Sequence, residues 1–159
     1  MRKAETVSVD TVVSLSALLL VILFGYALSS KLNEHTKFAE YMKLVPVPLI
    51  QQYATVIAWA VPLAEAVTAI MLCLERWRKT GLVLAFLLLL VFEIYIAAML
   101  LLGLELPCTC SGFISKLGWK PHLIFNAFFM FISVLPFLYQ RHVTKKYFQI
   151  GPSDILRPL

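Results

Sequence analysis

The residues best suited to chemistry are two cysteines one residue apart, in the segment Pro107-Cys108-Thr109-Cys110-Ser111-Gly112. Two thiols at this spacing can close a small, strained disulfide ring, and strained, exposed disulfides are the ones that exchange readily with other thiols. The sequence therefore predicts a redox pair with Cys108 and Cys110 as its catalytic residues. A static structural disulfide and a metal site are the alternatives.

Metal binding by the same thiols needs further ligands. His122 is the nearest candidate, and Cys108, Cys110 and His122 make three ligands, short of the usual four of a closed zinc site. Copper or mercury accept fewer soft ligands, so soft-metal binding stays open. His122 could instead stabilise a nearby thiolate or cap the membrane interface. The third cysteine, Cys73, is predicted to be a buried thiol that packs as a small hydrophobe.

Two carboxylates stand inside long apolar runs, Glu65 in the second run and Glu93 in the third. An acid at the centre of a membrane helix costs about 2.5–3.5 kcal/mol on insertion scales, which makes it a functional candidate. If the two lie close together, at most one should be ionised, because like charges repel and burial disfavours both charged forms. We expect a buried acid pair that moves protons or binds a carrier. The alternative is that both are protonated and form interhelical hydrogen bonds.

The elements that hold these residues follow from composition. The chain has 159 residues, 60% hydrophobic and 14% charged, with a mean hydropathy of +0.84. A soluble domain of this size has too little interior to bury so much apolar surface. Four runs are each long enough to cross a bilayer as a helix; they cover residues 12–30, 53–74, 81–103 and 122–139. The prediction is an all-α integral membrane protein, a single four-helix transmembrane bundle over residues 1–159, with a short polar tail at 140–159.

The basic residues predict an orientation. Nine Lys and Arg lie on one side of the predicted membrane and five on the other, and the richer side should be cytoplasmic. Both termini then face the cytoplasm, while the segments 31–52 and 104–121 face outward, the first partly helical along the membrane surface. In a bacterium the outer side is the oxidising periplasm. The net charge of +5 is read as this membrane-flanking charge and not as a nucleic-acid surface.

Several of these features together resemble a known family. The four spans, Lys31 after the first, Pro62 and Glu65 in the second, and the Cys108-Thr109-Cys110-Ser111-Gly112 segment are similar to the MauE branch of the DoxX-like membrane proteins. The Leu117-Gly118-Trp119 segment and the region of Asn126 are similar too. Thr109 and Ser111 depart from the family's Cys-Gly-Cys-Phe-Gly form. The missing Gly makes a small ring harder to close, which favours the metal alternative slightly.

The resemblance implies a redox-associated protein of the bacterial inner membrane that supports maturation of a disulfide-rich periplasmic protein. A thioredoxin-like or disulfide-containing partner is expected, and thiol-disulfide oxidoreductase activity would belong to Cys108 and Cys110. Glu93 lies ten residues before Gly103, about 15 Å along a helix, so it cannot contact Cys108 directly unless the loop folds back into the bundle. A lipid-soluble carrier such as a quinone could bridge that gap. The alternatives are a non-catalytic anchoring subunit in an oligomer or larger membrane complex, and a soft-metal handling protein.

Overall fold

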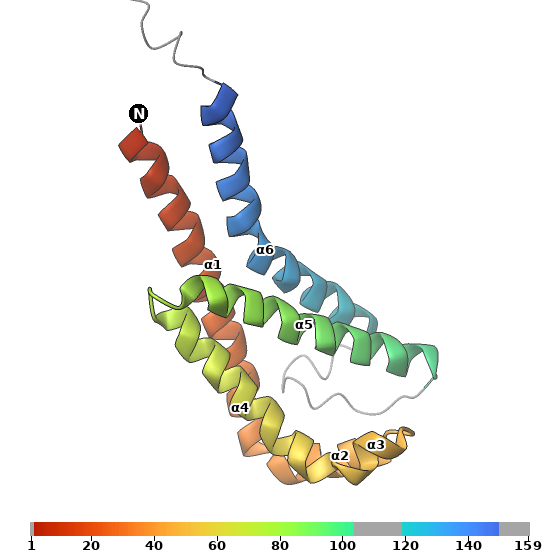
Figure 1. Ribbon diagram of the computed structural model, residues 1–159. Helices are drawn as coiled ribbons and strands as arrows, with labels where there is room; N and C mark the ends of the chain where they lie inside the picture. The colour runs from red at the N-terminus through yellow and green to blue at the C-terminus, as the bar shows by residue number, and fades with distance from the viewer. Residues whose placement is uncertain (1, 104–118, 150–159) are drawn as a thin grey trace, which may run out of the picture.

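The computed structural model describes residues 2–103 and 119–149, with side chains described over 9–103 and 121–145, and all of its regular elements there are helices. Figure 1 shows their arrangement. The elements in chain order are α1 (Arg2–Asn33), α2 (His35–Leu44), α3 (Pro48–Gln52), α4 (Ala54–Cys73), α5 (Arg78–Leu101) and α6 (Trp119–Gln149).

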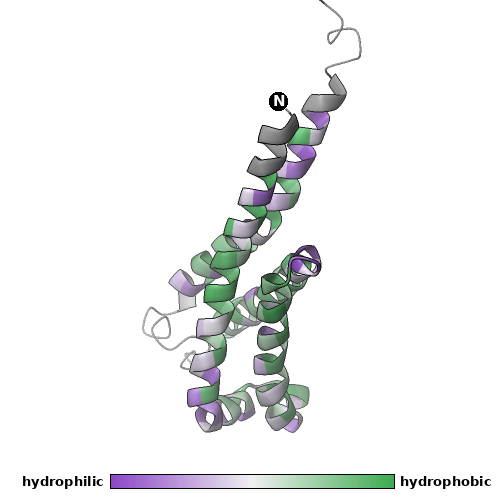
Figure 2. Ribbon diagram, turned by 90° about the vertical axis from the view of Figure 1, so that its left-hand side faces the viewer, coloured by the Kyte–Doolittle hydropathy of each residue, from purple (hydrophilic) through white to green (hydrophobic). Residues whose placement is uncertain are grey.

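Among the described residues, four helices are long and apolar enough to cross a membrane, in agreement with the predicted bundle. The candidate spans are Val9–Asn33, Ala54–Cys73, Arg78–Leu101 and Pro121–Lys145. Hydrophobic residues run along these helices, and hydrophilic ones gather towards their ends (Figure 2). α6 continues ten residues beyond the predicted end of its span at 139, to Gln149, because a helix satisfies its own backbone hydrogen bonds whether or not its residues are apolar. Pro136 lies inside α6, which bends part of the way along its length (Figure 1).

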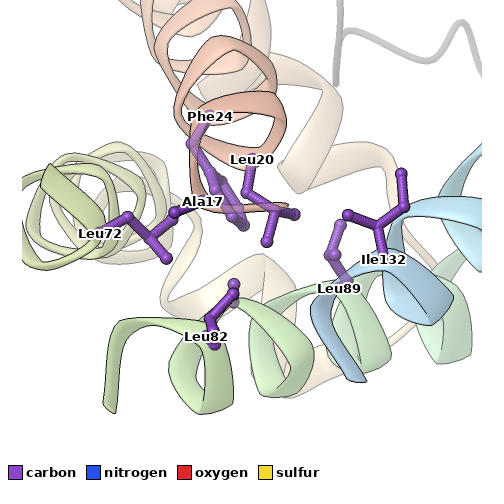
Figure 3. Close-up of a cluster of buried hydrophobic side chains, with 8 residues drawn as sticks. Ala17, Leu20, Phe24, Leu72, Leu82, Leu89 and Ile132 are labelled. Carbon is purple, nitrogen blue, oxygen red and sulfur yellow. The ribbon is translucent and has the colours of Figure 1, made fainter. Parts of the chain in front are cut away.

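One hydrophobic core joins the four long helices. α1 packs against α4 and α6, and α5 packs against α4 and α6. Figure 3 shows side chains from all four meeting at the centre of the bundle. The buried members are Ala17, Leu20, Phe24, Leu72, Leu82, Ala85, Leu89 and Ile132.

A second, smaller core fixes the segment between α1 and α4. α2 follows α1 after the single residue Glu34 and buries Phe38 and Met42 against Ala54 and Ala58 of α4. The predicted outer segment is therefore partly helical, as expected. It covers the first half of α4, while α1 covers the second half, so α1 and α2 together line α4 along its length.

Two glycines allow the tight connections at the ends of α5. Gly81 lies against α4, where an added Cβ would stand 3.0 Å from the Leu72 nitrogen and 3.1 Å from the Met71 carbonyl carbon. Gly103 follows the other end of α5 with φ of 64°, a left-handed conformation that favours glycine and is common just after a helix.

Candidate functional site

An ion pair lies inside the bundle. The Lys31 Nζ donates a hydrogen bond to Glu65 Oε1 at 2.6 Å, and the two side chains are 2% and 0% exposed. Glu65 stands eleven residues after Ala54, about 16 Å along α4. A buried charge is tolerated where an opposite charge and hydrogen bonds compensate for lost hydration, so the lysine explains how α4 carries a carboxylate so far from its ends.

The position of α2 explains why a lysine near the end of α1 is buried. α1 ends at Asn33, two residues after Lys31, where the chain turns into α2 and continues along α4. The Lys31 ammonium therefore lies beside the middle of α4 instead of reaching the surface. It also lies 5.5 Å from the centre of the Phe92 ring on α5, within the range of a cation–π interaction.

A second polar contact joins α5 and α6. Asn126 on α6 donates from Nδ2 to the backbone oxygen of Leu89 at 2.8 Å and to Glu93 Oε2 at 2.7 Å. Both amide hydrogens of Asn126 are thereby used. Glu93 is half-buried, whereas Asn126 is only 5% exposed. The two helices are held together by a side chain that meets both a carbonyl and a carboxylate.

A small cavity of about 40 Å³ lies between these two contacts. Its polar lining comes from α1, α4 and α6, namely Lys31, Glu65, His122 and Asn126, and its apolar lining is Leu23, Phe24, Ala27, Leu89, Phe92 and Phe125. His122 is 7% exposed and shares the cavity lining with Lys31. His122 therefore faces the interior of the bundle, at the start of the candidate span Pro121–Lys145.

The two acids of the predicted pair have different hydrogen-bond partners. Glu65 bonds to Lys31 and Glu93 bonds to Asn126, and within the described helices no protein group bonds to Glu65 Oε2. Glu65 lines the cavity and pairs with Lys31 of α1, whereas Glu93 accepts from Asn126 of α6.

The predicted cysteine pair, Cys108 and Cys110, lies outside the described residues. Cys73 was predicted to be buried, and this was wrong: it is exposed at the end of α4, where the chain leaves the packed part of the bundle. Within the ranges 2–103 and 119–149, no three His, Cys, Asp or Glu side chains cluster as metal ligands would.

Sequence reasoning missed the importance of Lys31. It was counted among the charges that flank the membrane, because lysines at the ends of apolar runs commonly extend to the interface. The available signal was Glu65 itself, since a carboxylate within a membrane helix requires a partner and Lys31 is the basic residue nearest to an apolar run on that side.

Four long apolar helices around a buried lysine–glutamate pair define a multi-pass membrane protein with a polar centre. The chain belongs to the MauE family: the family described as "Methylamine utilisation protein MauE" matches residues 9–139. That range includes Lys31, Glu65, Cys108, Cys110 and His122. No curated protein and no solved structure matches the chain.

Proposed function

We propose that this protein is a redox protein of the bacterial inner membrane that exchanges electrons with thiol or disulfide partners on the periplasmic side, through Cys108 and Cys110. The exchange would support maturation of a secreted or periplasmic protein. The observation that carries the proposal is the family match, which spans both cysteines together with the buried polar residues. Methylamine utilisation, the process in the family's description, is the first process in which to look for the partner.

The helix connections support a site at one end of the bundle. α1 and α4 are antiparallel where Lys31 meets Glu65, so the end of α1, the start of α4, the end of α5 and the start of α6 lie at the same end. In the sequence, the segment that carries the two cysteines connects α5 to α6. It leads directly into α6, whose His122 and Asn126 line the polar cavity.

The exchange reaction balances without any further reactant. A thiolate of one partner attacks the disulfide of the other, and one sulfur leaves as a thiolate while a mixed disulfide forms. The second thiolate of the attacking pair then displaces the remaining sulfur. Two electrons pass from the dithiol to the disulfide, and two protons follow overall. The direction depends on which pair is more strongly oxidising.

Glu65 and Glu93 take a supporting role in this proposal. Neither is expected to touch sulfur, and both are candidates for handling protons when a lipid-soluble carrier of the quinone class regenerates the disulfide. In that step the dithiol becomes a disulfide and loses two electrons and two protons, which convert the quinone to a quinol. Glu65 and Glu93 are therefore positioning or proton-handling residues, and Cys108 and Cys110 are the catalytic ones.

The test is a trapping experiment in a Cys73→Ser background. A thiol left without its resolving neighbour keeps the partner bound, so Cys110→Ser or Cys108→Ser should accumulate a mixed disulfide that reducing agent releases and mass spectrometry identifies. The matched control is the double variant Cys108→Ser/Cys110→Ser, which should trap nothing. Absence of any reducible adduct from both single variants, with normal protein levels, contradicts the proposal. A partner that still co-purifies with the double variant would instead favour an anchoring subunit.

A further inference from the structure

The cavity between α1, α4, α5 and α6 contains two buried polar atoms to which no protein group bonds. Within the described chain these are Glu65 Oε2 and His122 Nδ1. Their residues are 0% and 7% exposed, and both line the same cavity. Buried polar groups in proteins are nearly always hydrogen-bonded to protein or to ordered water, so these two atoms point to a ligand between them.

The size of the cavity limits what that ligand can be. A site needs roughly 10–15 Å³ of this kind of volume for one water molecule. The volume of about 40 Å³ therefore accommodates water but no organic ring. The chemistry also fits, because water both donates and accepts. It can donate to the carboxylate oxygen of Glu65 and bond to Nδ1 of His122, whichever tautomer the imidazole adopts.

The remaining polar lining meets the second requirement for a buried water, which needs two to four polar partners. Lys31 and Asn126 line the same space as Glu65 and His122. The remaining lining residues, including Phe92 and Phe125, are apolar. Their side chains therefore offer no hydrogen-bond donor to Glu65 Oε2. We propose that this cavity is a hydration site, in which water bridges Glu65 Oε2 and His122 Nδ1 and completes a hydrogen-bonded chain from Lys31 to His122.

The hydrogen-bonded chain from Lys31 to His122 provides a route for proton transfer. It connects a carboxylate in the middle of α4 with an imidazole in the first turns of α6. A proton that leaves an imidazolium breaks an N–H bond and joins the water, which releases a different proton to Glu65 Oε2. Imidazole, water and a carboxylic acid remain, so the transfer balances. The hydration site stands on the cavity alone, whether or not the cysteine pair exchanges electrons.

The hydration site can be tested by NMR on the full-length chain in lipid nanodiscs, with ¹⁵N and ¹³C in its histidine rings. His122→Gln assigns the His122 signals by removing them. The proposal predicts cross-peaks between water protons and the ring protons of His122. Ala27 lines the cavity, so Ala27→Val fills it and should abolish those cross-peaks without changing any polar group. Ala60→Val, on the exposed face of α4, is the matched control and should retain them.

The outcomes separate cleanly. A wild-type spectrum without water cross-peaks to His122 overturns the proposal, and so do cross-peaks that persist in folded Ala27→Val. If Ala27→Val does not fold, Leu23→Phe enlarges another lining residue and is read in the same way. Because the cysteines take no part in this measurement, its result is independent of the trapping experiment.

Discussion

Lys31 and Glu65 form an ion pair of 2.6 Å between the end of α1 and the middle of α4, and neither side chain is more than 2% exposed. Breaking such a pair from one side leaves an uncompensated buried charge, which costs about 3–5 kcal/mol, whereas replacing both partners by apolar residues is often neutral. We expect Lys31→Met alone to destabilise the bundle by this amount, and Lys31→Met/Glu65→Met to recover most of the loss. Unfolding by SDS in mixed micelles, followed by tryptophan fluorescence, measures both.

The exposed pair Lys37–Glu34 supplies the control for this experiment. Its atoms are 3.5 Å apart and its side chains are 61% and 47% exposed. Lys37→Met should therefore change the free energy of unfolding by no more than about 1 kcal/mol. If Lys31→Met were as mild as Lys37→Met, the pair would not have the structural importance assigned to it.

Asn126 should hold α5 and α6 together through its two donated hydrogen bonds. Asn126→Leu removes this donor from the Glu93 carboxylate and from the Leu89 carbonyl, which keeps its bond within α5. Leaving the half-buried carboxylate without the donor costs about 1–3 kcal/mol. The same unfolding assay measures the loss. Thr144→Val is the matched control, because the Thr144 hydroxyl donates to the Gln140 oxygen on an exposed part of α6 and should be nearly neutral. Equal stability of the two variants would argue against the role of Asn126.

Gly81 should be required for the close approach of α4 and α5. In Gly81→Ala the new Cβ meets backbone atoms of Leu72 and Met71 at 3.0 and 3.1 Å, and the helices must move apart. Overpacking of this kind costs about 1–3 kcal/mol. Gly25→Ala in α1 meets nothing within 4 Å and should be neutral or stabilising by up to about 1 kcal/mol, since alanine is the better helix former. The reverse order of stabilities would contradict the described packing.

The orientation predicted from the basic residues can be tested with the cysteines. Cys73 is exposed at the end of α4, next to the turn into α5, and α5 runs from that turn to Leu101. In single-cysteine variants, a membrane-impermeant maleimide should label Cys108 in spheroplasts and Cys73 in inverted vesicles. Labelling of Cys73 in intact spheroplasts would reverse the orientation and place Cys108 in the cytoplasm.

The sequence predicted the spans well, because an apolar run of about 20 residues has few alternatives to a membrane helix. It also identified Glu65 and Glu93, since an acid in such a run is conspicuous. It did not identify the partner of either acid. Lys31 lies at the end of its run, where an interfacial position is the usual expectation. Its burial is seen only with α2 packed against Ala54 and Ala58 of α4.

The remaining differences have similar causes. Cys73 was predicted to be buried from its residue type, but exposure depends on which face of α4 it occupies, and the weakly amphipathic helix gives little indication of that. α6 continues past 139 into polar residues, where hydropathy detects the end of the apolar run and not the end of the helix. The cavity at His122 is formed where four helices meet, and no local sequence pattern predicts such a meeting point.

The central claim, that Cys108 and Cys110 turn over as a redox pair, is tested most directly by their oxidation state in living cells. Acid-quenched cells that carry the Cys73→Ser variant would be labelled with a mass-tagged maleimide, with and without prior reduction. The proposal predicts a mixture of oxidised and reduced protein whose proportions shift with respiratory state. A pair that is fully reduced, or fully oxidised and indifferent to conditions, would contradict it and favour metal binding or a static structural role.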